Sequence, residues 1–165
     1  MLTQSELRQE LYYDVNSGLF TRIKSNHHSV MVGDIAGSLN THGYVGIKVF
    51  GKLYLAHRLA YLYMLGETPD EVDHINHIRA DNRWVNLRDV TRSENCKNNS
   101  KRKDNASGVT GVHWKKRDSR WVAQIRVDKE TLWLGQFVKF SDAVDARKNA
   151  EVLYGFHENH GKEGL

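Results

Sequence analysis

The sequence predicts an α+β fold that is divided into two small domains. Three observations lead to this prediction. In the first half, alternating apolar and polar residues give way to helical spacing, which is typical of strands followed by a helix. A basic and then small, polar stretch, Lys101–Gly108, has the composition of a linker. Three short β-rich segments and one alanine-rich segment follow it.

The first half of the chain is predicted to contain strands and then one helix. Residues 18–24 are rich in β-forming side chains, and the alternating stretch 43–58, with Gly51 at a turn, predicts a hairpin. Apolar residues at helical spacing then predict a helix over residues 56–66 that ends at its glycine. We expect His57, at the start of this helix, to be structural or to contact a phosphate.

The next region has the order strand, loop, strand, helix. Glu71–His74 and Leu87–Val90 read as short strands, with a polar loop between them. Thr91 and Glu94 have the spacing of a capping box, so a helix is expected directly after the second strand.

The second half predicts a domain of three strands and one helix. The β-rich segments lie at residues 110–116, 120–127 and 131–137. The helix is expected over residues 141–155, with Ser141 as its N-cap and small residues on the stripe that faces the sheet. We place the domain boundary near residue 105, which gives domains of residues 1–104 and 105–165.

The composition excludes several classes of protein. The chain has 165 residues and one cysteine, so an intrachain disulfide is impossible and a cysteine-built zinc site is disfavoured. No window is apolar enough to span a bilayer, and the N-terminal segment lacks the features of a signal peptide. We therefore expect a cytoplasmic protein that is not secreted and has no membrane partner.

The positive charge is concentrated in one block of the chain. The net charge is +4, but residues 92–126 alone carry ten basic and three acidic side chains. Clustered Lys and Arg can neutralise a polyanion and release its counterions, as nucleic-acid-binding proteins do. A solvated charged face explains the same block, and charge alone does not choose between the two.

The stretch "VDHIN", Val72–Asn76, places a carboxylate, an imidazole and an amide close together. A metal site, a histidine that supports a loop and a polar turn are all compatible with it. Phosphodiester cleavage needs a base near pH 7, which imidazole supplies, and a hard divalent cation with oxygen ligands. His74 could be the base, and Asp73 and Asn95 could offer oxygens. Adjacent residues of a strand point to opposite faces, so a shared site requires a bend at Asp73-His74.

This region resembles the HNH endonucleases, whose active site is a ββα-metal motif. The matching stretches are Asp73-His74, Asp81–Leu87 and Thr91–Asn95. The stretches Gly43–Val49 and Tyr54–Glu67 extend the likeness to phage and intron-associated homing endonucleases, and hence to the cytoplasm of a bacterial host.

The resemblance implies a role for each of four residues. His74 would be the general base, and Asp73 and Asn95 would hold one Mg²⁺ or Mn²⁺ ion per site. Asn86 would hydrogen-bond across the loop and keep the two strands in register. The nuclease domain would cover residues 1–104, with the ββα-metal motif at residues 71–103.

One position departs from the family, because His77 stands where these proteins usually have glycine. The loop is therefore expected to bend differently there, with His77 exposed or against a phosphate. A structural alternative also remains, in which Asp73, His74 and Asn86 form a buried polar network that supports a loop.

Residues 107–155 resemble a second family, the plant ethylene-response-factor (APETALA-type) DNA-binding domain. In that family a three-stranded sheet lies in the major groove of DNA and a helix packs behind it. The resemblance implies DNA contacts by Thr110, His113, Lys115, Arg117, Gln124, Arg126 and Trp133. The base preference should differ from that of the plant proteins, since several of their arginines are replaced.

The same resemblance leaves other side chains for the core and for phosphates. We expect Val112, Ile125 and Leu134 in the core, whereas Trp114 and Trp121 fit either the core or the DNA sugars. Basic side chains between the two domains would track phosphates, namely Arg92, Lys97, Lys101, Arg102 and Lys103. The alternative is a small βββα domain of unknown use.

Three functions compete on this sequence. The first is a site-specific DNA endonuclease that binds double-stranded DNA, is a monomer or weak dimer, and nicks one strand as a monomer. The second is a non-catalytic DNA-binding or regulatory protein on a nuclease fold, which the completeness of Asp73, His74 and Asn95 disfavours. The third is an RNA-binding protein, which a groove-reading sheet disfavours because the major groove of A-form RNA is narrow.

Overall fold

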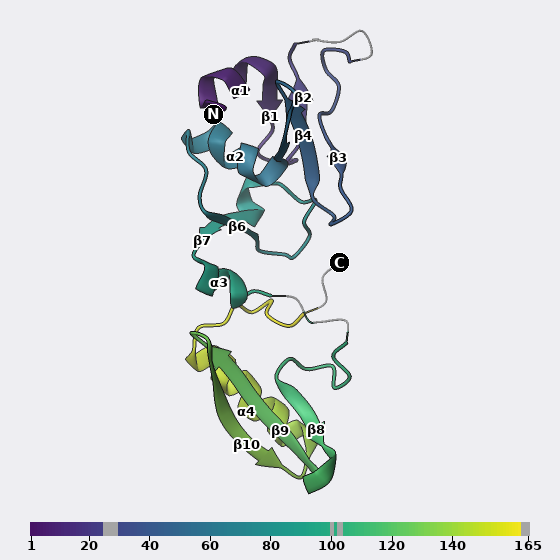
Figure 1. Ribbon diagram of the computed structural model, residues 1–165, viewed down its shortest axis with the longest axis vertical. Coiled ribbons are helices and arrows are strands. Elements are labelled where there is room, and N and C mark those ends of the chain that lie inside the picture. Colours follow the sequence, from purple (N-terminus) through teal and green to yellow (C-terminus); the bar gives the residue numbers. More distant parts are fainter. Residues whose placement is uncertain (25–29, 100, 102–103, 163–165) are drawn as a thin grey trace. The chain divides into compact units, whose positions relative to one another are not determined.

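The computed structural model describes residues 1–24, 30–99, 101 and 104–162. It divides into two compact units, Met1–Thr91 and Arg92–Leu165, which are described separately below. Each unit mixes α and β structure, as the sequence predicts, with small antiparallel sheets and α-helices (Figure 1). No helix in the described part of the chain is long and apolar enough to span a membrane.

The first unit begins with a helix and a strand pair. Helix α1, Gln4–Glu10, starts at a capping box in which Thr3 and Glu6 bond each other's backbone N–H. Strand β1, Leu11–Tyr13, follows without a loop and pairs with β2, Phe20–Arg22. Strand β2 is predicted from the sequence, whereas helix α1 is not, although the spacing of Thr3 and Glu6 indicates a helix start.

A three-stranded sheet comes next. Strands β3 (Ser38–Leu39), β4 (Val45–Val49) and β5 (Lys52–Leu55) lie side by side in this order. The predicted hairpin is β4–β5, and its two turn residues, Phe50 and Gly51, have φ of 47° and 77°. Positive φ at both central residues matches the right-handed twist of the strands, which explains the glycine.

Helix α2, Ala56–Leu65, follows β5 directly and closes the core of the first unit. Gly66 ends it with φ of 82°, as the sequence predicts. The core joins α1, α2 and the sheets, and its fully buried members include Leu7, Leu11, Phe20, Ile47, Leu59 and Ala60. Tyr63 contributes a ring that meets Tyr13 and Phe20 edge-on.

Two further strands end the first unit. Strand β6, Glu71–His74, pairs antiparallel with β7, Leu87–Val90, and both have the predicted bounds. A loop and a short 3₁₀ helix, Trp84–Asn86, connect them. The register sets Asp73 opposite Arg88 and His74 opposite Leu87.

The second unit contains a three-stranded sheet covered by one helix. The strands are β8 (Val112–Lys115), β9 (Arg120–Val127) and β10 (Glu130–Phe137), with β9 in the centre. Helix α4, Phe140–Leu153, lies along one face of the sheet (Figure 1). Ala143 and Ala150 are buried on this helix, so that it approaches the strands closely.

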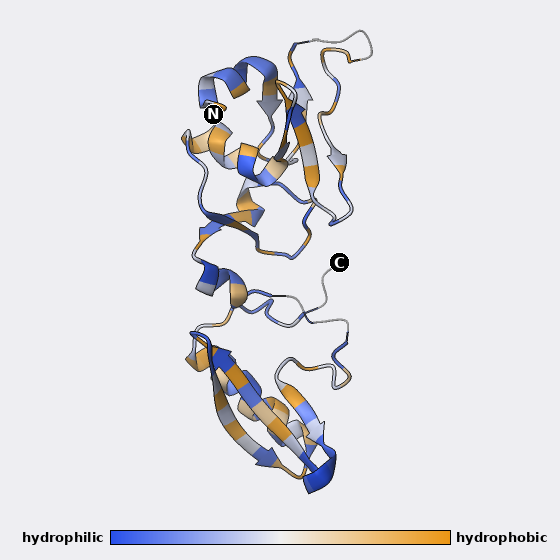
Figure 2. Ribbon diagram, viewed as in Figure 1, coloured by the Kyte–Doolittle hydropathy of each residue, from blue (hydrophilic) through white to orange (hydrophobic). Residues whose placement is uncertain are grey.

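One detail of the second unit differs from prediction, and the two tryptophans whose place was open are now separated. Ser141 is not the N-cap of α4; Lys139 takes that position, and the Ser141 hydroxyl donates to Asp142 in the first turn. Trp114 is half exposed, whereas Trp121 packs with its ring 4.6 Å from that of Phe140. Hydrophobic and hydrophilic residues alternate along β9 and β10 (Figure 2), so one sheet face is apolar and the other polar.

The short helix α3, Arg92–Cys96, belongs to the second unit. Ser93 donates to Asp128, and the backbone of Lys97 and Asn99 accepts hydrogen bonds from His157 and Gly161. These bonds join the segment after α3 to the segment after α4. These hydrogen bonds explain why the second compact unit begins at Arg92. The composition of the linker, in contrast, predicts a domain boundary near residue 105.

Candidate functional site

Strand β6 carries the two residues of the motif that are adjacent in sequence. Asp73 and His74 are 8% and 5% exposed. They point to opposite faces of a regular strand, but His74 is the last residue of β6, where the chain turns into the loop. Asp73 Oδ2 accepts from Arg88 Nε and Nη2 at 2.9 and 2.7 Å, across the strand pair.

A buried asparagine holds the His74 imidazole. Asn82 Oδ1 lies 3.3 Å from His74 Nε2, and Asn82 is 2% exposed. Asn82 Nδ2 donates to the carbonyl of Ala80, so the amide oxygen is the atom that faces the ring. An acceptor at Nε2 requires the proton on Nε2, which places the basic lone pair of the neutral ring on Nδ1.

Burial is the main cause that lowers the pKa of His74, and the hydrogen bond to Asn82 and the charge of Asp73 partly oppose it. A lowered pKa keeps the imidazole neutral near pH 7, which is the form that accepts a proton. Asn82 is not predicted as a site residue, since no spacing rule connects it with a histidine eight residues earlier. Only the fold brings the two side chains together.

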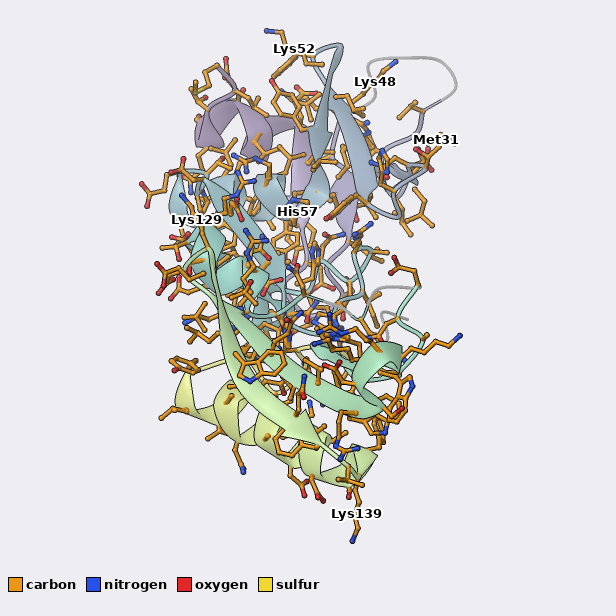
Figure 3. All side chains as sticks on the ribbon, turned by 60° about the horizontal axis from the view of Figure 1, so that its bottom comes forward. Met31, Lys48, Lys52, His57, Lys129 and Lys139 are labelled. Carbon is orange, nitrogen blue, oxygen red and sulfur yellow. The ribbon has the colours of Figure 1, made fainter. Side chains whose placement is uncertain are left out.

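Two further rings pack beside His74. The His57 ring lies 5.0 Å from it at an interplanar angle of 85°, and the Tyr44 ring lies 5.9 Å from it. His57 stands at the start of α2 (Figure 3). Its Nδ1 is buried without a hydrogen-bond partner among the described residues, and burial, with the nearby His74 and Arg58, lowers its pKa to about 3. His57 is therefore a neutral core side chain and not a second base.

The loop after β6 is held by its own amides. Asn86 accepts from the backbone N–H of Asn76 and donates to the carbonyl of Asp81, so that it joins both ends of the loop. Asn76 Nδ2 donates to Asp81 at 2.7 Å. Arg83 hydrogen-bonds Asp81 and is the main cause that lowers the pKa of this carboxyl to about 2.

His77 has a left-handed backbone, with φ of 65°. Its N–H donates to the carbonyl of His74 and closes the turn. Glycine adopts this conformation without strain, which explains why the resemblance places glycine here. The turn at His77 thus has a glycine-like conformation despite the substitution.

The donor atoms can be compared with the needs of a divalent metal. Within the described residues, no group of three or more His, Cys, Asp and Glu side chains could hold an ion. Asp73 and Asn95 offer one carboxylate and one amide oxygen, and Asn95 lies on α3 in the second unit. Mg²⁺ commonly binds through one or two protein oxygens and takes the rest from water and phosphate. The Asp73 carboxylate beside His74 is an oxygen ligand of the kind that Mg²⁺ takes.

The second unit places most of the predicted DNA contacts on one face of its sheet. Cross-strand pairs share a face, and the pairs on the side away from α4 are His113–Val122, Lys115–Arg120, Gln124–Trp133 and Arg126–Thr131. Trp133 is 58% exposed there, whereas Val122 on the same face is buried, as are Val112 and Ile125 of the predicted core. The Arg117 side chain is exposed in the turn after β8.

Other predicted contacts lie elsewhere. The Thr110 hydroxyl is closed to solvent, since Oγ1 is buried, and it has no hydrogen-bond partner in the described part of the chain. Lys101 donates its backbone N–H to Lys162, and Arg102 and Lys103 fall outside the described residues.

A cavity of about 1150 Å³ opens beside β9 in the second unit. Its basic lining residues are Arg92, Lys97, Arg126, Lys129 and Arg147. Arg147 is fully engaged with Glu151, His160 and the Gln124 carbonyl. Arg92, Arg126 and Lys129 form no salt bridge with any described residue, so their charges are available to an anion. Lys129 lies at one end of β10 and Lys139 beyond the other (Figure 3).

Comparison with known proteins gives one match. Residues 54–97 match the family model described as HNH endonuclease, from β5 to the residue after α3. No curated protein and no solved structure matches the chain. The matched segment contains His74 with Asp73, Asn82, Asn86 and Asn95, and this agreement supports an HNH nuclease.

Proposed function

We propose that this protein is a site-specific DNA endonuclease of the homing type that depends on a divalent metal and hydrolyses phosphodiester bonds with His74 as general base. One observation carries the proposal: within the matched segment, burial favours the neutral form of His74, and Asn82 accepts from its Nε2, so that the basic nitrogen is directed away from Asn82. The Asp73 carboxylate, next to His74 in the chain, is itself oriented by Arg88.

Each residue of the matched segment has a defined task in this proposal. His74 Nδ1 takes a proton from the attacking water, and Asn82 stabilises the imidazolium that results. Asp73 would hold one Mg²⁺ or Mn²⁺ ion, with Asn95 as the second ligand that the resemblance implies, and the ion would supply positive charge beside the phosphate and the leaving oxygen. Asn86 keeps the loop closed, so that His74 and its partners stay in position.

The second unit is proposed to bind double-stranded DNA through the sheet face that bears Trp133. Support comes from the polar and basic side chains on this face, from the exposed Trp133 and from the unneutralised charges of Arg92, Arg126 and Lys129. A β-ribbon enters the major groove of B-DNA, as the resemblance to the ethylene-response-factor domain implies. The enzyme is further proposed to nick one strand as a monomer or weak dimer, in the cytoplasm of a phage-infected bacterium.

The test is a nicking assay on supercoiled plasmid and on phage and bacterial genomic DNA with Mg²⁺ or Mn²⁺. We expect nicked product from the wild type, and a loss of about a thousandfold in His74→Ala, the size of a general-base contribution. Asp73→Ala should lose activity as well. Chelation with EDTA should stop the reaction. A wild type that nicks no DNA under any metal would end the enzyme proposal, and a His74→Ala variant as fast as wild type would end the base assignment.

One contact favours a second candidate, a DNA-binding regulator without catalysis. Arg88 already occupies Asp73 Oδ2, so a metal would have to use the other oxygen or displace the arginine. If the regulator is the correct function, the wild type binds DNA in gel-shift assays but gives no nicked plasmid. The variant Arg88→Gln, which releases Asp73, then distinguishes the two functions in the nicking assay. A regulator should still give no nicked plasmid, whereas a nuclease should still nick.

A further inference from the structure

Arg79 is a loop residue whose side chain is held in place although it is exposed. It lies between β6 and the 3₁₀ helix, and its Nη1 donates to the carbonyl of His42 at 2.9 Å. Its guanidinium lies over the Tyr44 ring, 5.1 Å from the ring centre. A planar guanidinium stacked on an aromatic face loses little further freedom when it binds an anion.

The surface under Arg79 is held by several hydrogen bonds and ring contacts. Asn40 Oδ1 accepts from the backbone N–H groups of His42 and Tyr44, and the Asn40 and Tyr44 backbones are also bonded to each other. The same Tyr44 ring packs against His57 at 5.2 Å and against His74 at 5.9 Å. One aromatic ring therefore carries the guanidinium on the site's edge and contacts the proposed base.

The charge of Arg79 is not neutralised by any of the residues that the structure describes. Of the arginines in and beside this loop, Arg83 pairs with Asp81 and Arg88 pairs with Asp73. Arg79 forms no salt bridge with any residue that the structure describes. Its charge nevertheless reaches the site, since it is a minor cause, behind burial, that lowers the pKa of His74. An exposed, fixed cation beside a base is suited to bind the anion on which the base acts.

We propose that Arg79 is a further catalytic residue that donates hydrogen bonds to a non-bridging oxygen of the scissile phosphate. In the step itself, the water oxygen bonds to phosphorus, its proton passes to His74, and the P–O3′ bond breaks. The 3′ oxygen then takes a proton from solvent. Arg79 forms no covalent bond and stabilises the negative charge that gathers on the phosphate oxygens. This inference rests on the proposed nuclease function.

The test measures single-turnover nicking with Mg²⁺ at saturating enzyme, beside DNA affinity from gel shifts in Ca²⁺. We expect Arg79→Ala to slow nicking by about a hundredfold, as loss of one fixed donor does, while affinity changes by less than about threefold. Arg79→Lys should recover only part of the rate, because an ammonium cannot bind the phosphate through two parallel bonds. The matched control is Arg22→Ala, which also removes a guanidinium bonded to a backbone carbonyl, here that of Lys48, and should nick as wild type does.

Two further measurements separate a phosphate contact from a structural effect. Free guanidinium at millimolar concentration should partly restore nicking by Arg79→Ala but not by His74→Ala. Tyr44→Leu should lose rate, since the stacking surface is gone, and Tyr44→Phe should not. Arg79→Ala nicking within about twofold of wild type, or losing only affinity, overturns the inference. A wild type that does not nick at all contradicts the nuclease proposal itself. This outcome is distinct from a failure of the Arg79 inference, in which the wild type still nicks.

Discussion

The loop between β6 and β7 and the open sheet face of the second unit are both rich in polar side chains, but they use them in opposite ways. In the loop, Asn82 and Asn86 are almost fully buried and bond to His74 and to the backbone. On the sheet face, Arg126 and Trp133 are exposed, while the apolar residues turn to α4. Buried, mutually bonded polar groups fix the geometry that chemistry needs, and exposed ones leave their bonding capacity to a ligand.

Within this comparison of loop and sheet face, the largest expected effect comes from removing the asparagine that orients the base. Asn82→Ala leaves His74 Nε2 without its acceptor, so that both the tautomer and the ring orientation are lost. We expect nicking to slow by about a hundredfold while DNA affinity stays the same. Single-turnover nicking and gel shifts measure the two effects. A variant that loses affinity but keeps its rate would contradict the division between loop and sheet face.

The second largest effect concerns the closure of the loop. Asn86→Ala leaves the N–H of Asn76 and the carbonyl of Asp81 without their side-chain partner, and Asn86 is a buried residue. The free energy of unfolding should fall by about 2 kcal/mol. Urea unfolding followed by circular dichroism measures it, and Asn16→Ala, at an exposed residue, is the control. Equal unfolding of the two variants would show that the loop amides do not stabilise the fold.

The third prediction addresses the sheet face. The double variant Arg126→Ala/Trp133→Ala removes one exposed cation and one exposed ring from cross-strand positions that are next to each other. We expect DNA affinity to fall by about tenfold and the salt dependence of binding to weaken, because one phosphate contact is lost. The rate at saturating enzyme should not change. Binding isotherms at several salt concentrations test this, with Lys139→Ala beyond the strand as the control. An unchanged affinity would remove the proposed role of this face.

The smallest effect is a dependence of stability on pH. Burial lowers the pKa of His57 to about 3, whereas an unfolded histidine has its ordinary value of 6.5. Below that value the unfolded chain binds a proton that the folded chain does not bind. The free energy of unfolding should therefore decrease as the pH falls from 6.5, by about 1 kcal/mol at pH 5.5.

His57→Phe provides the comparison for this pH dependence. It keeps an aromatic ring but has no group to protonate, so urea unfolding between pH 7.5 and 5.5 should show a flatter profile than wild type. Unfolding of the second unit is the internal reference for the pH profile, since the polar face of its sheet is exposed and His57 lies in the first unit. Identical profiles for wild type and His57→Phe would mean that His57 takes up a proton in the folded state without a penalty.

The fold of both units follows closely from local sequence patterns. The bounds of β6 and β7, the hairpin at Gly51 and the end of α2 at Gly66 are all predicted, because alternation and glycine act over a few residues. The start of α4 is predicted two residues late, since Ser141 is a good N-cap in isolation but Lys139 has the extended backbone. Helix α1 and β1 are missed although a capping box precedes them.

The sequence alone determined the order of the elements and the residue types of the motif, from Asp73 and His74 to Asn95. These depend on covalent neighbours and on side-chain chemistry, which a sequence states directly. The tertiary structure decided which groups meet: Asn82 with His74, Arg88 with Asp73, and Arg79 with Tyr44. Such pairings depend on register and loop closure, and the free energy that selects them is shared among many distant contacts.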